Sequence, residues 1–161
     1  MLAPQAIDPR NAYLVQSLMR DVVKRGTGRG ALVLEREDLA GKTGTTNEFR
    51  DTWFSGMGGG LVATVWIGFD DFTPLGRDEF AAKTSLPIWT EFMRVALEGR
   101  EQLAFDPPPG ITVANIDPGS GRLVGSAGGI PEFFKAEDIT RLMSAAAEES
   151  EPREQPSYEI F

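Results

Sequence analysis

LAGKTGTT at residues 39–46 is the stretch that decides the fold, together with TWFSGM at residues 52–57 and LVATVWIGF at residues 61–69. The first segment is rich in Thr and Gly and has no helical period, which indicates a strand with small side chains. The third segment gives the strongest strand signal in the chain. Three consecutive glycines at residues 58–60 form a turn that tolerates positive φ. The sequence therefore predicts an antiparallel meander of three strands.

A helix is predicted over residues 9–25, before the meander. Asp8 is placed to be its N-cap, and Pro9 suits the first helical position. We expect Gly26 to end the helix in the left-handed conformation. Apolar residues recur at four-residue spacing and predict a wide apolar stripe; its rows are Leu14, Leu18 and Val22, and Val15, Met19 and Val23.

A second helix is predicted over residues 86–98, after the meander, with Gly99 as its stop. Its apolar face has two rows, which are Ile88, Phe92 and Ala96, and Trp89, Met93 and Leu97. We expect Trp53, Trp66 and Trp89 to be core or half-core residues, as aromatic side chains usually are. Helices packed with an antiparallel sheet define an α+β fold class.

The composition changes after Arg100, and we expect three regions with boundaries at residues 1–100, 101–147 and 148–161. Residues 101–106 are read as a solvated linker, and the run DPPPG at 106–110 is a stiff break. The last region is acidic and contains two prolines, so we expect a disordered tail.

Short elements are predicted between the proline-rich break and the tail. Residues 111–116 form a strand, and residues 122–124 return as its partner after the turn DPGSG at 117–121. Residues 136–147 form a short helix.

Composition excludes several kinds of chemistry. The chain has 161 residues and a net charge of −8, from 24 acidic and 16 basic side chains, which argues against a nucleic-acid groove. It has no His and no Cys, so imidazole bases and thiolate nucleophiles are ruled out. No apolar stretch is long enough to span a bilayer, and the first ten residues are no signal peptide. We expect any export signal or membrane anchor to lie on sequence outside this chain.

Two charged pairs favour structural explanations over functional ones. Asp70 and Asp71 could bind a cation, but adjacent carboxylates at a strand end are usually a solvated turn, and we expect no metal and no cofactor. Arg50 and Asp51 are close to residues 42–45 in sequence and can line the rim of a cleft, or form a loop ion pair worth little.

The run Gly41-Lys42-Thr43-Gly44-Thr45 carries the main chemical signal. A phosphate loop needs a Gly at position 36, where this chain has Arg, and a helix directly after the Lys.

A Lys-Thr-Gly box of penicillin-interacting serine enzymes fits better. Two glycines without side chains let a peptide lie alongside as an added strand. The ammonium places a positive charge in the cleft, and the two Thr hydroxyls can donate to a substrate carboxylate. A backbone N–H near Thr45 can face a developing oxyanion. The alternative is a Thr-rich surface strand with a solvated Lys.

Six blocks in the same order resemble the C-terminal part of the transpeptidase domain of class A penicillin-binding proteins, with the 1A type nearest. They are DPRNAYL (8–14), DVVKRGTG (21–28), DLAGKTGTTN (38–47), WFSG (53–56), VWIGFDD (65–71) and PEFF (131–134). The resemblance implies part of the fold shared by penicillin-binding proteins and β-lactamases. It also implies an acyl-serine mechanism, in which a Ser attacks the D-Ala-D-Ala bond of a peptidoglycan stem peptide and penicillin traps that Ser. By motif position, Lys42, Thr43, Gly44 and Thr45 inherit substrate docking.

The family's nucleophile motif is not found in this sequence. None of the eight serines has a Lys three residues later, as Ser-x-x-Lys requires, or an Asn two residues later, as Ser-x-Asn requires. Both motifs, a glycosyltransferase domain and a membrane anchor precede the Lys-Thr-Gly box in the family. We therefore expect a fragment of a D,D-transpeptidase that carries the substrate-binding strand and is inactive alone. Its implied partners are the stem peptide, β-lactams and the N-terminal half of the domain, at the periplasmic face of the inner membrane. Two alternatives are a non-catalytic binding module derived from the fold and an unrelated phosphate-binding protein.

Overall fold

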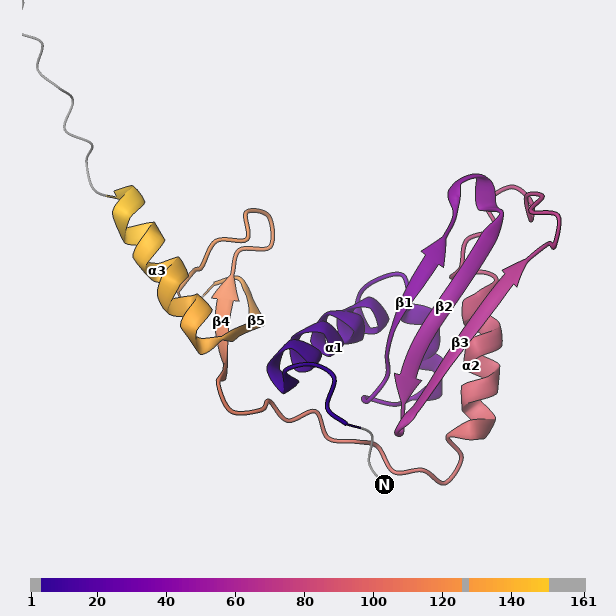
Figure 1. The fold of residues 1–161 in the computed structure, drawn as a ribbon, viewed down its shortest axis with the longest axis horizontal. Helices are drawn as coiled ribbons and strands as arrows, with labels where there is room; N and C mark the ends of the chain where they lie inside the picture. The colour runs from indigo at the N-terminus through magenta and orange to yellow at the C-terminus, as the bar shows by residue number, and fades with distance from the viewer. Residues whose placement is uncertain (1–3, 126–127, 151–161) are drawn as a thin grey trace, which may run out of the picture. The chain divides into compact units, whose positions relative to one another are not determined.

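The computed structural model describes residues 4–125 and 128–150. These residues belong to two compact units, each described here by itself. One is Asn11–Asp106, and the other consists of the described parts of Met1–Arg10 and Pro107–Phe161. The elements in chain order are α1 Pro9–Lys24, η1 Arg29–Leu34, β1 Ala40–Thr45, η2 Asn47–Phe49, β2 Asp51–Gly58, β3 Leu61–Gly68, α2 Ser85–Ala96, β4 Ile111–Ile116, β5 Ile130–Lys135 and α3 Ala136–Ser150 (Figure 1).

The three predicted strands form one antiparallel sheet in the order β1-β2-β3, which confirms the predicted meander. Thr43 of β1 lies opposite Phe54 of β2, and Phe54 lies opposite Val65 of β3. Gly59 and Gly60 have φ angles of 56° and 76°. Positive φ at both central residues is the geometry of the tight hairpin turns that suit twisted strands, so glycine is required there.

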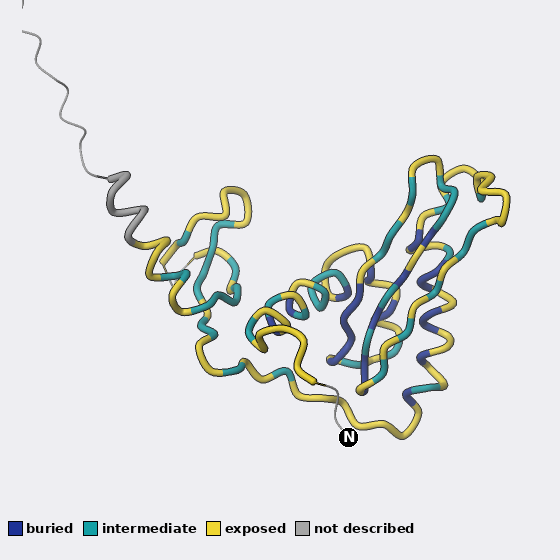
Figure 2. Tube along the Cα trace, viewed as in Figure 1, coloured by how far each residue is buried: buried dark blue, intermediate teal, exposed yellow. Residues whose placement is uncertain are grey.

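The core of this unit lies between β2 and α2. Alternate residues of β2 are buried, as period-2 side-chain geometry requires for a sheet covered on one face (Figure 2). The Trp89 ring meets the Phe54 ring edge-on with centroids 4.9 Å apart, and Trp89 Nε1 donates to the Ala63 carbonyl at 3.0 Å. A Cβ on Gly56 would lie 2.7 Å from Trp89 Cζ2, so the bare backbone at Gly56 makes room for the indole.

Only one of the two apolar rows predicted for the second helix is buried. Trp89, Met93 and Leu97 are buried, whereas Ile88 and Phe92 are more than half exposed. Trp89 is in the core, whereas Trp53 and Trp66 pair with each other on the sheet and are 44% and 45% exposed, which is the half-core position also predicted. Their side chains lie on the face of β2 and β3 that α2 does not cover, since the buried residues of β2 alternate with Trp53.

The predicted first helix is confirmed as α1, and its start has the expected cap. Asp8 Oδ1 accepts the backbone N–H of Arg10 at 2.8 Å. The predicted apolar stripe is only partly buried, because Val15 and Leu18 are more than half exposed and Val23 is buried. The expected left-handed conformation of Gly26 is wrong, because its φ is not positive. Gly26 is required for a different reason, since a Cβ there would lie 2.9 Å from Val22 Cα.

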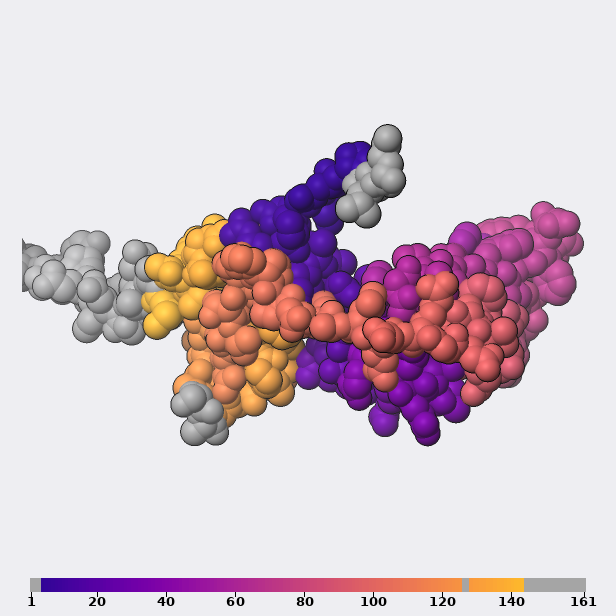
Figure 3. Space-filling view, turned by 90° about the horizontal axis from the view of Figure 1, so that it is seen from below, coloured from indigo at the N-terminus to yellow at the C-terminus, as the bar shows by residue number. Residues whose placement is uncertain are grey.

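A buried ion pair holds the segment after α2. Residues 101–106 are mostly exposed, as predicted for a solvated linker, but the backbone of this segment is hydrogen-bonded to Arg36 and Asp38. Arg36 donates two hydrogen bonds to the Asp38 carboxylate, at 2.9 and 2.8 Å. The same carboxylate accepts the N–H groups of Gly59 and Leu103, at 2.8 and 3.0 Å. Further along, Phe105 stacks on Tyr13 and lies under the Arg20 guanidinium. The segment consequently lies along the surface of this unit (Figure 3).

The second unit contains a β-hairpin and a helix. The partner of β4 is β5, and the predicted partner, residues 122–124, contributes only a single bridge between Ile116 and Leu123. Residues 130–135 are richer in Ile and Phe, which favour a pleated surface. Helix α3 continues to Ser150, three residues beyond its predicted end and into the predicted tail. The rest of that tail lies outside the described residues.

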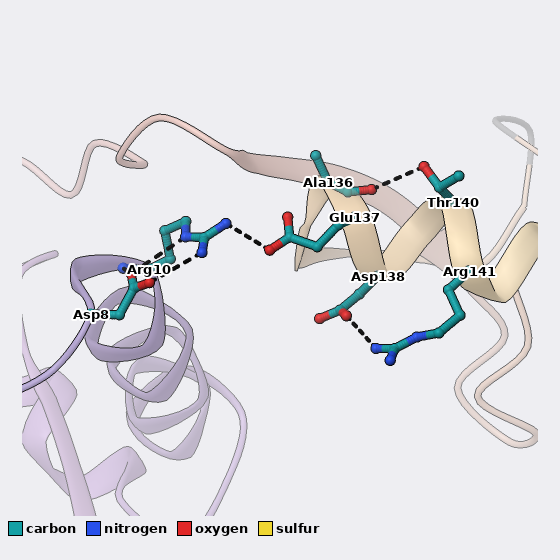
Figure 4. A network of polar contacts seen from close by, with 7 residues as sticks. All are labelled: Asp8, Arg10, Ala136, Glu137, Asp138, Thr140 and Arg141. Carbon is teal, nitrogen blue, oxygen red and sulfur yellow. Dashed lines mark hydrogen bonds and ion pairs between the residues drawn. The ribbon is translucent and has the colours of Figure 1, made fainter.

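Arg10 holds the start of α3 within the second unit. Its guanidinium donates to Asp8 Oδ2 at 3.1 Å and to Glu137 Oε1 at 2.8 Å (Figure 4). A Cβ on Gly110 would lie 3.3 Å from Arg10 Cδ, and the Gly110 carbonyl accepts the N–H of Ala136 at 3.0 Å. Arg10 therefore brings together the chain before α1 and the first turn of α3.

None of the helices over residues 4–125 and 128–150 is both long and apolar enough to cross a membrane.

We predict that Asp38→Asn destabilises the 161-residue chain by about 3 kcal/mol at pH 7, because it leaves the Arg36 charge buried without a counter-ion. Burial acts to raise the pKa of Asp38, but hydrogen bonds from Arg36, Leu103 and Gly59 outweigh it and lower that pKa from 3.8 to about 2. A carboxylate with a lowered pKa stabilises the fold above about pH 4 and loses this effect as the pH falls through about 2. Urea unfolding between pH 7 and pH 2 measures the difference.

The matched control is Glu37→Gln, because the Glu37 side chain next to Asp38 is exposed. We expect the control to unfold like the wild type at every pH. A difference between Asp38→Asn and wild type that stays the same down to pH 2 would contradict the assignment.

Candidate functional site

The residues of the predicted Lys-Thr-Gly box all lie on β1, an edge strand of the described sheet. By register, Thr43 and Thr45 lie opposite the buried Phe54 and Thr52 of β2. Lys42 alternates with them and belongs to the opposite face. Because the run is a strand and is followed by η2 and β2, the phosphate-loop alternative is wrong.

A polar cluster forms where Lys42 and Thr43 meet the loop after α1. Lys42 Nζ donates to the Thr43 carbonyl at 2.7 Å and lies 3.5 Å from Thr43 Oγ1. Thr43 Oγ1 is 2.7 Å from the Thr27 hydroxyl, and either oxygen can be the donor. Sequence reasoning missed Thr27 as a site residue. The one available signal was its place between two glycines directly after a helix, in the block DVVKRGTG.

Thr45 is held by a different segment from Thr43. Its Oγ1 accepts the backbone N–H of Ala81 at 3.1 Å. Ala81 lies in the loop between β3 and α2, and Phe80 of that loop packs edge-on against Phe49 of η2 with ring centroids 4.9 Å apart. The N–H of Leu75 donates to the Phe49 carbonyl at 2.8 Å. The two hydroxyls of the box are thus positioned from two directions, one by the loop after α1 and one by the loop before α2.

The charged residues near the box have structural partners. Arg50 pairs with Glu48 and lies over the Phe72 ring, while Asp51 accepts the Trp66 Nε1–H at 2.9 Å. The predicted ion pair between Arg50 and Asp51 is therefore wrong. Asp71 accepts the N–H and the hydroxyl of Thr73, at 3.1 and 2.9 Å, as in a polar turn. The described residues contain no group of three or more carboxylates that could hold a metal ion.

The two glycines of the box have different surroundings. A Cβ on Gly41 would lie 2.6 Å from Phe54 Cζ and 3.0 Å from the Ser55 carbonyl oxygen, inside the core. A Cβ on Gly44 would lie 3.3 Å from Trp53 Cβ, a contact that a small shift can relieve. Folding therefore requires a glycine at position 41 more strictly than at position 44.

Two hollows lie between η1 and α2, and neither is lined by residues of the box. One, of about 260 Å³, is lined by residues that include Leu86 and Thr90. The other, of about 570 Å³, is lined by residues that include Met93 and Leu97. The groove predicted beside residues 42–45 remains a prediction.

Comparison with known proteins identifies the family. Residues 2–59 match the family model described as penicillin binding protein transpeptidase domain. The chain is 49% identical over 138 residues to penicillin-binding protein 1A of Pseudomonas aeruginosa, covering 84% of this chain and 17% of that protein. It is 48% identical over 113 residues to penicillin-binding protein 1A of Neisseria lactamica, covering 70% of this chain and 14% of that protein.

A solved structure gives the same answer. The crystal structure of penicillin-binding protein 1A from Haemophilus influenzae matches 83% of this chain, with a TM-score of 0.76 and 36% sequence identity, and the match covers 21% of that chain. The chain belongs to the transpeptidase family of penicillin-binding proteins. Within that family it corresponds to the C-terminal part of the domain in class A proteins of the 1A type, and it spans less than a quarter of the relatives compared.

We predict that Gly41→Ala destabilises the 161-residue chain by about 2 kcal/mol, because the added methyl group overpacks the Phe54 ring. Gly44→Ala is its matched control within the same strand, and we expect it to stay within about 0.5 kcal/mol of wild type. Urea unfolding monitored by tryptophan fluorescence compares the two variants. Equal loss of stability in both would show that the space around Phe54 is not what requires Gly41.

Proposed function

We propose that this chain supplies the substrate-binding strand of a peptidoglycan D,D-transpeptidase. The observation that carries the proposal is the polar cluster of Lys42 and Thr43 on an edge strand, in a chain of the penicillin-binding protein family. An edge strand offers unpaired backbone groups to an extended peptide. The strand fits a stem peptide that lies beside β1 and ends in D-Ala-D-Ala.

The side chains of β1 have the chemistry to bind the end of such a peptide. Thr43 and Thr45 belong to the same face of the strand by register, so both hydroxyls can donate to one carboxylate. Although Lys42 belongs to the opposite face of the strand, its Nζ lies 3.5 Å from Thr43 Oγ1, so its ammonium can attract the same negative charge. Gly44 adds no side chain between them. A β-lactam carries a carboxylate in the same relation to its reactive carbonyl, which supports penicillin as a second ligand.

The nucleophile of this reaction has to come from sequence other than these residues. None of the eight serines here begins a Ser-x-x-Lys motif. We therefore propose that the acyl-enzyme forms on a Ser in the preceding part of the domain, and that this segment alone forms no covalent penicillin adduct. The whole protein would act at the periplasmic face of the inner membrane, where peptidoglycan is cross-linked.

We predict that fluorescent penicillin labels a chimera but leaves the 161-residue chain unlabelled. The chimera is the Pseudomonas aeruginosa relative with its 138 aligned residues replaced by those of this chain. Lys42→Ala in the chimera should lower the second-order rate of labelling by at least about tenfold, because a charge-assisted contact is lost. Denaturing gels after timed incubation measure the rate.

The control variant is Thr64→Val, on a strand that does not border the box. It should label at the rate of the unmodified chimera. A labelled band from the 161-residue chain would refute the proposed division of roles. A Lys42→Ala chimera that melts normally and labels at the full rate would refute the role of the strand.

A further inference from the structure

Thr27 and Thr43 form a hydroxyl pair whose two partners come from different elements. Their oxygens are 2.7 Å apart, at the usual length of an O–H···O hydrogen bond. A hydroxyl has one proton and two acceptor sites, so the direction of this bond decides what the other groups around Thr43 can do. If Thr43 donates to Thr27, its proton is used; if it accepts, its proton is available to a ligand.

Lys42 restricts the directions that hydrogen bonds at Thr43 Oγ1 can take. An ammonium only donates, and Lys42 Nζ already donates to the Thr43 carbonyl at 2.7 Å while lying 3.5 Å from the hydroxyl oxygen. The Thr43 oxygen therefore faces one cation and one neutral hydroxyl. The ammonium takes one acceptor site of Thr43 Oγ1, whereas the Thr27 hydroxyl can donate or accept. In the arrangement where Thr27 donates, the Thr43 proton points elsewhere.

The backbone around Thr27 holds its hydroxyl within hydrogen-bonding distance of Thr43. The flanking residues Gly26 and Gly28 both donate their N–H groups to the Val22 carbonyl at the end of α1, at 3.1 and 2.9 Å. A Cβ on Gly28 would lie 3.1 Å from that carbonyl oxygen. Glycine on both sides lets the loop fold tightly onto the helix end, so Thr27 has little freedom to move away from Thr43.

We propose that Thr27 is a positioning residue, which donates to Thr43 Oγ1 and so holds the Thr43 proton ready for the carboxylate of a peptide or β-lactam. The inference rests on the function proposed above for β1. Thr27 itself does not touch the ligand, and its effect is transmitted wholly through Thr43. Removing the Thr27 hydroxyl should therefore matter only while Thr43 keeps its own.

A double-mutant cycle in the chimera tests this. We expect Thr27→Val and Thr43→Val each to lower the second-order rate of penicillin acylation, Thr27→Val by about fivefold. The double variant should be no slower than Thr43→Val alone. Thr27→Ser, which keeps a hydroxyl, should restore most of the rate. With a penicillin methyl ester, whose carboxylate is blocked, Thr27→Val should have no effect on the rate.

Thr64→Val provides the matched control, because Thr64 and Ser55 form a similar hydroxyl pair on the same sheet, at 2.8 Å. It should leave all rates unchanged. If Thr43→Val has no effect, the function proposed for β1 fails. If Thr43→Val slows acylation but Thr27→Val does not, the inference about Thr27 is overturned and the proposed function stands. The same conclusion follows if Thr27→Val slows acylation as much in the Thr43→Val background, or as much with the methyl ester, as it does in the unmodified chimera with penicillin. Thr27→Val can also lower the melting temperature of the chimera. In that case the comparison is made with Thr27→Ser at matched stability, and equal slowing by Thr27→Ser would overturn the inference about Thr27.

Discussion

The contact between Trp89 and the bare backbone of the sheet is the constraint on which the larger unit depends. The indole occupies the space over Gly56, where any side chain would collide with it, and the Phe54 ring meets it edge-on. The same Phe54 ring excludes a side chain at Gly41 on the neighbouring strand. One aromatic pair therefore fixes the position of α2 against β2 and also the composition of β1. The box at residues 42–45 begins directly after a position that the core controls.

Local patterns in the sequence predicted the sheet well. Glycines at residues 58–60 set the hairpin, and the alternation along β2 follows from one covered face. The patterns could not say which apolar row of a helix is covered, because that depends on the neighbour it packs against. Trp89 and Phe92 are equally apolar in sequence, yet the first is buried and the second is more than half exposed. The partner of β4 was misplaced for the same reason, since strand pairing is a long-range property.

The site was predictable in part. The box was found from residue types and spacing, and the structure adds the two segments that orient its hydroxyls. Thr27 is 16 residues from Thr43 and Ala81 is 36 residues from Thr45, so no local motif links either pair. The Asp38 carboxylate shows the same limit, because its partners Gly59 and Leu103 become neighbours only when the chain folds.

The unpaired edge of β3 has a consequence for handling this protein. Within the described residues β3 pairs only with β2, and its eight residues include no charged side chain and no proline. Natural sheets usually protect such an edge with lysines, prolines or bulges. A sample of this chain at high concentration should therefore form oligomers by edge-to-edge pairing of β3 strands. One lysine introduced at an outward position of β3 should keep the protein monomeric for study.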